Sequence, residues 1–215
     1  MSTASSRPSR KSLSPTVPDP DERKRRLVDI VIADVGIVVL SPLLATVALL
    51  IKLESRGPVL FRQKRVGRHG RLFDILKFRS MTVPTAGEAT VATVDDMESF
   101  QFRPVGRKTL IGRALRACSL DELPNLLNVL RGDLHLVGPR PDEVDLVAQY
   151  RPEWQRRHDV KPGITGLAQI HGRTDLTYGE TMAYDLDYVH NHPFSRDVRI
   201  ILKTLGVVLR REGAR

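Results

Sequence analysis

Residues 35–51 read VGIVVLSPLLATVALLI, an apolar run without a charged side chain, and this stretch decides how the chain is organised. At about 1.5 Å per residue, a helix of this length spans about 26 Å, slightly less than a hydrocarbon core of about 30 Å. Extending the run upstream brings in Asp29 and Asp34. The run fits a tilted transmembrane helix, a helix that enters and leaves the membrane on one side, or a buried core helix.

The dipeptide Ser41-Pro42 and the flanking charges favour the second interpretation. Proline removes a backbone donor and disrupts the preceding turn, and a serine hydroxyl can bond to the freed carbonyl. Cytoplasmic flanks of membrane segments are enriched in Lys and Arg, and here both flanks are basic. These basic residues are Arg23, Lys24, Arg25 and Arg26 before the run and Lys52, Arg56, Arg62, Lys64, Arg65 and Arg68 after it. We therefore predict a re-entrant membrane helix over residues 23–53, broken at Ser41 and Pro42.

Composition narrows the classes of partner. The chain has 215 residues, enough for one domain of ordinary size with a true core. Its net charge is +9 and its pI about 10.1, so we expect an anionic partner, whether nucleic acid, anionic lipid or a phosphorylated small molecule. Cys118 is the single cysteine, which excludes an intrachain disulfide. Residues 1–22 carry few large apolar side chains, so we expect a disordered tail there.

Downstream of the apolar run, the sequence predicts a mostly α fold with one small β-hairpin. Short apolar-basic runs at 59–64 and 72–78 flank a glycine-containing turn at 67–71. Residues 82–104 have the composition of a loop. Three helices are expected, over residues 107–131, 142–158 and 194–211. The last is basic and amphipathic, and it fits either an interfacial helix at a membrane or a helix that closes the core.

Two adjacent carboxylates, Asp121 and Glu122, are the candidate catalytic residues. Neighbouring helical residues point about 100° apart, so the pair can serve one site in different roles. One carboxylate can attack a phosphorus atom while the other holds a metal ion or moves a proton. Adjacent acids are also common on solvated helix surfaces. The histidines lack metal-ligand spacing, and His171 is a candidate substrate contact.

Three arginines are candidate phosphate-binding residues, because the planar guanidinium matches a pair of phosphate oxygens. Arg116 lies shortly before the acidic pair. Arg140 is bracketed by two prolines, which restrict its backbone. Arg173 follows residues 161–172, a glycine-punctuated stretch that can let backbone approach a phosphate. Each arginine could instead belong to a surface or structural salt bridge.

From Arg25 to about Arg211 the chain resembles the bacterial sugar transferases that start surface-glycan assembly, the monotopic polyprenyl-phosphate phosphoglycosyl transferases, in their minimal catalytic form. Seven motifs in the same order carry the resemblance: Arg25-Arg26-Leu27-Val28-Asp29, Ser41-Pro42, Lys77-Phe78-Arg79-Ser80-Met81, Ser119-Leu120-Asp121-Glu122-Leu123-Pro124, Asn128-Val129-Leu130-Arg131-Gly132-Asp133, Val137-Gly138-Pro139-Arg140-Pro141 and Lys161-Pro162-Gly163-Ile164-Thr165-Gly166. Leu167 and His171 depart from the pattern, where tryptophan and asparagine are frequent, and this concerns the nucleotide- or sugar-side contacts.

The resemblance implies an enzyme that moves a sugar 1-phosphate from a UDP-sugar to polyprenyl (undecaprenyl) phosphate and releases UMP. It implies Mg²⁺ as the cofactor, Asp121 as the nucleophile and Glu122 as its partner, with both carboxylates at the metal. Lys77, which belongs to a matching motif, joins the three arginines as an expected phosphate contact. Such an enzyme starts the assembly of exopolysaccharide, capsule, O-antigen or a glycoprotein glycan.

The resemblance also implies a location and partners. Residues 54–215 would form a cytosolic catalytic domain with membrane-interfacial helices, and the active site would lie on the cytoplasmic face of the bacterial inner membrane. Expected partners are a UDP-sugar, polyprenyl phosphate and inner-membrane lipid, with a homodimer left open and no nucleic acid. The alternative is a non-catalytic, membrane-tethered basic protein that binds nucleic acid or anionic lipid. This alternative accounts for the charge but for neither the acidic pair nor the proline-bracketed Arg140.

Overall fold

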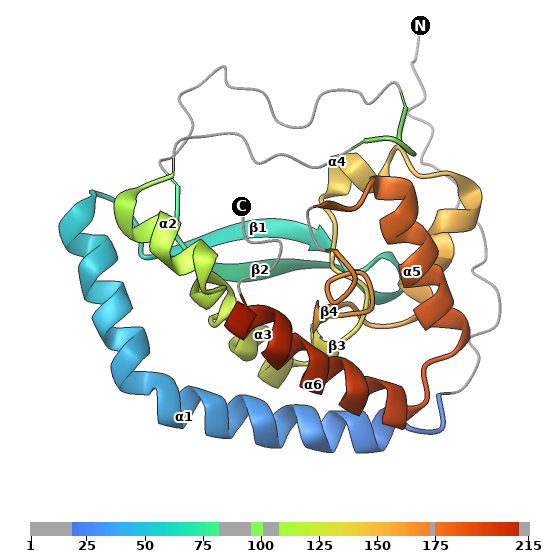
Figure 1. Cartoon of the computed structure of the whole chain (residues 1–215), viewed down its shortest axis with the longest axis horizontal. Coiled ribbons are helices and arrows are strands. Elements are labelled where there is room, and N and C mark those ends of the chain that lie inside the picture. The colour runs from blue at the N-terminus through green and yellow to red at the C-terminus, as the bar shows by residue number, and fades with distance from the viewer. Residues whose placement is uncertain (1–18, 82–95, 101–107, 173–174, 211–215) are drawn as a thin grey trace, which may run out of the picture.

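The computed structural model describes residues 19–81, 96–100, 108–172 and 175–210. A long bent helix, α1, lies along one side of the molecule, and a two-stranded hairpin stands beside it among shorter helices (Figure 1). The elements in chain order are α1 (Glu22–Glu54), β1 (Leu60–Val66), η1 (Arg68–Gly70), β2 (Leu72–Phe78), α2 (Leu110–Ala117), η2 (Leu120–Glu122), α3 (Asn125–Arg131), β3 (His135–Val137), α4 (Val144–Val147), η3 (Pro152–Asp159), β4 (Gly163–Thr165), α5 (Tyr178–His190) and α6 (Phe194–Arg210). Most of the predicted tail at 1–22 and of the predicted loop at 82–104 lies outside the described residues.

Pro42 bends α1 without interrupting it. Its missing N–H would have bonded to the Val38 carbonyl one turn earlier. The Ser41 hydroxyl donates to that carbonyl instead, over 2.8 Å, and the Thr46 hydroxyl donates to the Pro42 carbonyl over 2.9 Å. Figure 1 shows α1 changing direction in its middle. The predicted role of Ser41 is confirmed, and the break takes the form of a bend within one continuous helix.

Both ends of α1 are anchored on the same globular body. Near the beginning of the helix, the Arg25 side chain is buried and its Nε donates to Asp197 of α6 over 2.5 Å. Near the end of the helix, Ile51 is buried in a cluster with Phe78 of β2 and Leu115 of α2. The two ends therefore cannot move apart without breaking polar contacts at one end or apolar packing at the other.

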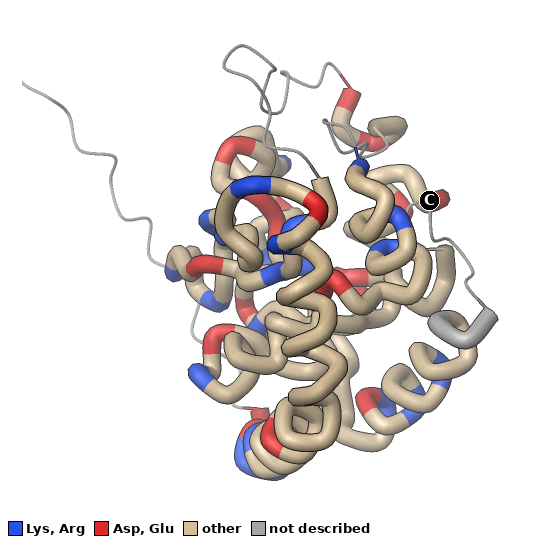
Figure 2. Tube along the Cα trace, turned by 90° about the vertical axis from the view of Figure 1, so that its left-hand side faces the viewer, with Lys and Arg blue, Asp and Glu red and all other residues tan. Residues whose placement is uncertain are grey.

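The middle of α1 is exposed. Val35, Val38 and Val39 are 54%, 64% and 67% exposed, and only 11% of the most apolar window of the helix is buried. In Figure 2 the C-terminal half of α1 faces the viewer, and the tube is tan over residues 35–51, which carry no charge. This exposure excludes the buried-core interpretation, and the helix is long and apolar enough for membrane association.

The predicted β-hairpin is confirmed. Strands β1 and β2 run antiparallel, with Leu60 opposite Phe78 and Val66 opposite Leu72. The turn between them holds Gly70 at φ 75°, a left-handed conformation that glycine adopts without a steric penalty. The hairpin places Lys77, near the end of β2, toward the helices that follow it.

The helix predicted over residues 107–131 is wrong in its continuity, because its described part forms α2, η2 and α3 instead. Ser119 adopts φ 55°, a left-handed conformation that ends an α-helix. Pro124 then lacks the N–H that would continue a helix back to the Leu120 carbonyl. Asp121 and Glu122 therefore lie on a single 3-10 turn between two short helices rather than on a helix surface.

The helix predicted over residues 142–158 is also wrong in its continuity. It divides into α4 and η3, because Pro152 has no N–H to donate and the preceding Arg151 is extended, with ψ 151°. The helix predicted over residues 194–211 is confirmed as α6, which is described as far as Arg210.

The prediction contained no helix at α5. A capping box begins this helix: the Thr177 side chain accepts the Glu180 N–H, and the Glu180 carboxylate accepts the Thr177 N–H over 2.7 Å. Thr177 and Glu180, three residues apart, are the signal in the sequence that could have predicted it. Helix α5 packs against η3 and completes the core on that side.

A short parallel pair of strands, β3 and β4, was also not predicted. Val137 stands opposite Thr165, and the two glycines beside the pair permit close backbone contact. A Cβ at Gly163 would lie 2.1 Å from the backbone nitrogen of Gly138. Two motifs that are distant in the sequence, one containing Arg140 and the other beginning at Lys161, are thereby joined backbone to backbone.

Two glycine substitutions test this packing. A Cβ at Gly112 of α2 would lie 1.9 Å from the Ser80 carbonyl oxygen, so we expect Gly112→Ala to lower the free energy of unfolding by about 1–3 kcal/mol through overpacking. Gly206 of α6 is the matched control, since nothing lies within 4 Å of its Cβ position. Gly206→Ala should stabilise by roughly 0.5–1 kcal/mol. Denaturant unfolding in detergent measures both, and an unchanged Gly112→Ala protein would contradict the α2 placement.

Candidate active site

The acidic pair lies where η2 meets β2. Ser119 and Pro124 delimit this turn, so its backbone direction is set by local conformation. The Asp121 side chain is buried, with the residue 9% exposed, and Glu122 is partly buried beside it. The 3-10 turn thus directs two consecutive carboxylates into the protein rather than into solvent.

Glu122 bridges two cations from other elements. Its Oε1 atom lies 3.1 Å from the Lys77 Nζ of β2 and 2.6 Å from Nη2 of Arg140, in the segment after β3. The second oxygen of Glu122 accepts from Nη1 of Arg140 over 3.4 Å. Arg140 and Glu122 therefore meet in a bidentate pair, which fixes the direction of the guanidinium. The Arg140 side chain remains 44% exposed and accessible to an anion.

Asparagines of α3 hold the strand that carries Lys77. The Leu76 N–H donates to Asn125 Oδ1 over 3.2 Å and to Asn128 Oδ1 over 3.1 Å, and Asn128 Nδ2 donates to the Asp74 carbonyl over 2.8 Å. These side chains take the place of a third strand along β2. Asn128 begins one of the seven motifs, but the motif does not predict that either asparagine holds a strand. Two asparagines on an otherwise apolar helix face were the available signal.

The segment that carries Arg140 is held on the edge of β1. The Val66 N–H donates to the Asp142 carbonyl over 3.0 Å, and Arg65 Nη2 lies 3.1 Å from the Glu143 carboxylate. The hairpin therefore positions both cations of the site, one within β2 and the other on the outer edge of β1.

The two carboxylates have pKa values shifted in opposite directions. Burial opposes the charged form of Glu122, but the attraction of Arg140 and Lys77 outweighs it and lowers the Glu122 pKa. Burial raises the pKa of Asp121, and the neighbouring Glu122 charge raises it further against the attraction of Lys77, Arg116 and Arg140. Divergent pKa values on paired acids are typical of a site in which the two groups have different tasks.

Asp121 is the carboxylate whose oxygens are not engaged by a neighbouring described residue. It forms no hydrogen bond or ion pair with any other residue in the described part of the chain, whereas both oxygens of Glu122 are engaged. The structure therefore separates a reactive candidate, Asp121, from an anchoring residue, Glu122.

The other candidate phosphate-binding residues are placed as follows. Arg116 of α2 is half-buried with Nη1 3.2 Å from the Met81 sulfur, and its charge acts on Asp121. Arg173 lies outside the described residues. Lys77, Arg140 and Arg116 are thus brought to the acidic pair from three separate elements.

The two departures from the family pattern have structural positions. Leu167 is buried in the main apolar cluster. His171 is exposed, stacks on Tyr184 with 4.7 Å between ring centroids, and has Nδ1 2.8 Å from the Leu167 carbonyl oxygen. The two positions are therefore linked by a contact between the His171 ring and the Leu167 backbone.

A magnesium ion would have few protein ligands here. The described residues contain no cluster of three or more His, Cys, Asp or Glu side chains. Mg²⁺ usually needs only one or two carboxylates when a substrate supplies phosphate oxygens. Asp121 offers such a carboxylate, while Glu122 would first have to exchange a cation partner. The donor set fits an ion that arrives with a phosphorylated substrate.

A long apolar helix compatible with membrane association, a buried acidic pair and converging cations together fit a protein that acts on anionic substrates. The chain belongs to the bacterial sugar transferase family, whose model matches residues 21–211. The resemblance inferred from the seven motifs is thus confirmed.

Curated relatives agree with this assignment. The chain is 42% identical over 199 residues to a UDP-glucose:undecaprenyl-phosphate glucose-1-phosphate transferase of Caulobacter vibrioides, covering 89% of this chain and 72% of that protein. It is 38% identical to an undecaprenyl-phosphate galactose phosphotransferase of Salmonella typhimurium, covering 88% of this chain and 41% of that protein. It is 39% identical to a UDP-N-acetylgalactosamine-undecaprenyl-phosphate N-acetylgalactosaminephosphotransferase of Aeromonas hydrophila, covering 89% and 45%. The chain therefore spans less than half the length of the last two relatives.

The pKa of Lys77 predicts the alkaline side of the activity profile. Burial, followed by the nearby Arg140 charge, lowers this pKa to about 8. Since Lys77 loses its positive charge as pH rises through about 8, we expect kcat/KM of the transferase to fall there. Lys77→Arg stays charged and should move the decline to higher pH. Lys64→Arg, an exposed neighbour on β1, is the control and should leave the profile unchanged. Superimposable profiles for Lys77→Arg and the unsubstituted enzyme would contradict the prediction.

Proposed function

We propose that this protein moves a sugar 1-phosphate from a UDP-sugar to polyprenyl phosphate, with a covalent intermediate on Asp121 and release of UMP. The observation that carries the proposal is the difference between the two carboxylates. Asp121 is buried and has a raised pKa, whereas Glu122 is paired with two cations. The relatives named above, which act on undecaprenyl phosphate by their names, support the same acceptor.

In the first half-reaction, an oxygen of Asp121 attacks the sugar-bearing phosphorus of the UDP-sugar. An aspartyl O–P bond forms, and the bond from that phosphorus to the bridging oxygen breaks with UMP as the leaving group. Arg140, Lys77 and Arg116 hold the phosphate oxygens and oppose the charge that develops on them. Arg173, predicted from its place after the glycine-punctuated stretch 161–172, is proposed as a further member of this set. The raised pKa of Asp121 also makes its carboxylate a better nucleophile once ionised.

In the second half-reaction, a phosphate oxygen of polyprenyl phosphate attacks the same phosphorus. A new pyrophosphate bond forms, the aspartyl O–P bond breaks, and Asp121 is regenerated as a carboxylate. Two half-reactions suit a soluble donor and a membrane-bound acceptor, because the two substrates need not occupy the site together.

We also propose that Mg²⁺ accompanies the donor, with Asp121 and, after partner exchange, Glu122 as its carboxylate ligands. When bound, the ion would neutralise pyrophosphate charge. Glu122 in the arrangement seen here keeps Lys77 and Arg140 close together for the same purpose.

For the membrane segment we propose a re-entrant helix at the cytoplasmic face of the inner membrane. Anchoring of both α1 ends on one body supports this, because a spanning helix would place its ends on opposite sides. The exposed apolar residues of α6 provide a second surface for the lipid interface, and they are Val198, Leu202 and Leu205.

The nucleophile assignment predicts the behaviour of two variants. Asp121→Asn should eliminate the radiolabelled sugar-phosphate adduct trapped without acceptor and reduce turnover by more than about a thousandfold. Glu122→Gln should still form the adduct, but about 10- to 1000-fold more slowly, because Lys77 and Arg140 lose their anionic partner. Asp145→Asn, an exposed acid on α4, is the control. A panel of UDP-sugars read by UMP release identifies the donor, and adduct formation by Asp121→Asn would refute the nucleophile assignment.

The re-entrant topology predicts the accessibility of two cysteines introduced into a Cys118→Ser background. Lys24→Cys and Arg56→Cys replace exposed residues close to the two ends of α1. Both should be shielded from an impermeant thiol reagent added to intact cells and labelled after permeabilisation. Labelling of one end alone in intact cells would indicate a spanning helix and reject the re-entrant arrangement.

A further inference from the structure

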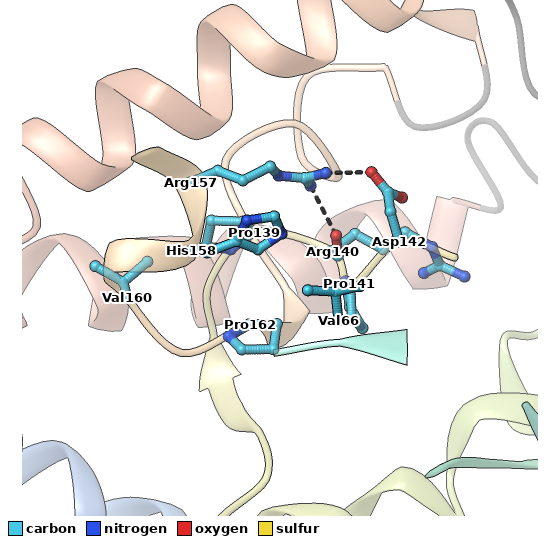
Figure 3. Close-up of a pocket in the computed structure, with 9 residues that line it drawn as sticks. All are labelled: Val66, Pro139, Arg140, Pro141, Asp142, Arg157, His158, Val160 and Pro162. Carbon is cyan, nitrogen blue, oxygen red and sulfur yellow. Dashed lines mark hydrogen bonds and ion pairs between the residues drawn. The ribbon is translucent and has the colours of Figure 1, made fainter. Parts of the chain in front are cut away.

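Arg157 is a buried cation that faces the back of the Arg140 segment. It comes from η3, is 3% exposed, and lines a small cavity with Pro139, Arg140, Pro141 and Asp142 (Figure 3). Its Nη2 atom donates to the Arg140 carbonyl oxygen over 2.7 Å. The same guanidinium is paired with the carboxylates of Asp142 and Asp185.

Arg140 has two ends with different partners. Figure 3 shows its carbonyl oxygen directed at Arg157 and its guanidinium pointing away from the cavity. That guanidinium is the group that pairs with Glu122. Any shift of the Arg140 backbone therefore moves the guanidinium relative to the acidic pair.

The segment depends on Arg157 because its own backbone offers few donors. Pro139 and Pro141 have no N–H, so the peptide groups around Arg140 cannot form an ordinary strand ladder. The Pro139 carbonyl accepts the Gly163 N–H over 2.9 Å, and the Asp142 carbonyl accepts the Val66 N–H over 3.0 Å. Between these two fixed points, Arg157 is the described side chain that bonds to the Arg140 carbonyl.

An arginine suits this position better than a lysine. The planar fork serves one carbonyl and two carboxylates at once, whereas an ammonium is a compact point donor.

The Tyr150 hydroxyl donates to Asp142 over 2.5 Å, and the Tyr178 hydroxyl also bonds to Asp142. Asp142 is thereby fixed from the η3 and α5 side as well.

We propose that Arg157 is a positioning residue of the transferase. By bonding to the Arg140 carbonyl and to Asp142, it orients the Arg140 guanidinium toward Glu122 and the substrate phosphates. This inference rests on the proposed function for the role of Arg140. It assigns Arg157 no contact with substrate, so its effect must pass through Arg140.

A double-mutant cycle tests that dependence, with UDP as the probe and calorimetry on the full chain in detergent as the measurement. Arg157→Lys should weaken UDP binding about fivefold or more when Arg140 is present, and about twofold or less in an Arg140→Ala background. The loss of Tm caused by Arg157→Lys should be larger when Arg140 is present, and only by the coupling of the Arg140–Glu122 pair. An equal loss of affinity in both backgrounds, or no loss in either, would overturn the proposal.

Arg25→Lys is the matched control. Arg25 is equally buried and likewise serves two carboxylates and one carbonyl, those of Asp19, Asp197 and His192. The Arg25→Lys substitution should lower Tm by about as much as Arg157→Lys does, and it should leave UDP affinity unchanged. An equal weakening of UDP binding by Arg25→Lys would show that the Arg157 effect is general destabilisation and would also overturn the proposal.

A second measurement needs no ligand. The Tm losses caused by Arg140→Ala and Glu122→Gln should be non-additive in the unsubstituted protein, because the two residues form one pair. In an Arg157→Lys background they should become additive. If the unsubstituted protein binds no UDP, the proposed function fails, and this second cycle still decides the positioning role. Non-additivity that survives Arg157→Lys would contradict it.

Discussion

The site depends on the ion pairs that the Glu122 carboxylate forms with Lys77 and Arg140. One anion holds Lys77 of β2 and Arg140 of the segment after β3, so a hairpin, a 3-10 turn and a proline-bracketed segment are fixed to one another. Removing one partner from such a partly buried group leaves the others uncompensated, which makes the arrangement costly to disturb. Glu122 also keeps close together two cations that would repel each other, and it does so directly beside Asp121.

The long helix and the site are mechanically connected. Arg26 of α1 donates to the Leu130 carbonyl at the C-terminal end of α3 over 2.7 Å, and Asn128 of the same helix α3 bonds to the backbone of β2. Strand β2 carries Lys77, which meets Glu122. Helix α1 is therefore also part of the packing around the site. Arg26 contacts α3, which holds the strand that carries Lys77.

Local signals in the sequence were sufficient for several parts of this structure. The hairpin and the bend at Ser41 and Pro42 depend on residues close together in the chain, and both could be predicted. The candidate residues of the site come from motifs, and the motifs do not give the geometry of those residues. The left-handed Ser119 resembles any helical serine in sequence, and Arg157 acquires its role from contacts with segments that only the tertiary fold brings together. Composition and periodicity contain no information about such contacts.

The unequal tasks of two adjacent acids follow from backbone constraint. Ser119 at positive φ and Pro124 confine the acidic pair to one tight turn, and Pro139 and Pro141 restrict the opposing Arg140 segment. Conformational freedom is thus removed before the side chains meet, which lowers the entropic cost of forming the Glu122 ion pairs. Because Arg140 and Lys77 bond to Glu122, the neighbouring Asp121 has no hydrogen-bond or ion-pair partner among the described residues. The same constraint that anchors the Glu122 carboxylate therefore leaves the Asp121 carboxylate without a polar partner among the described residues.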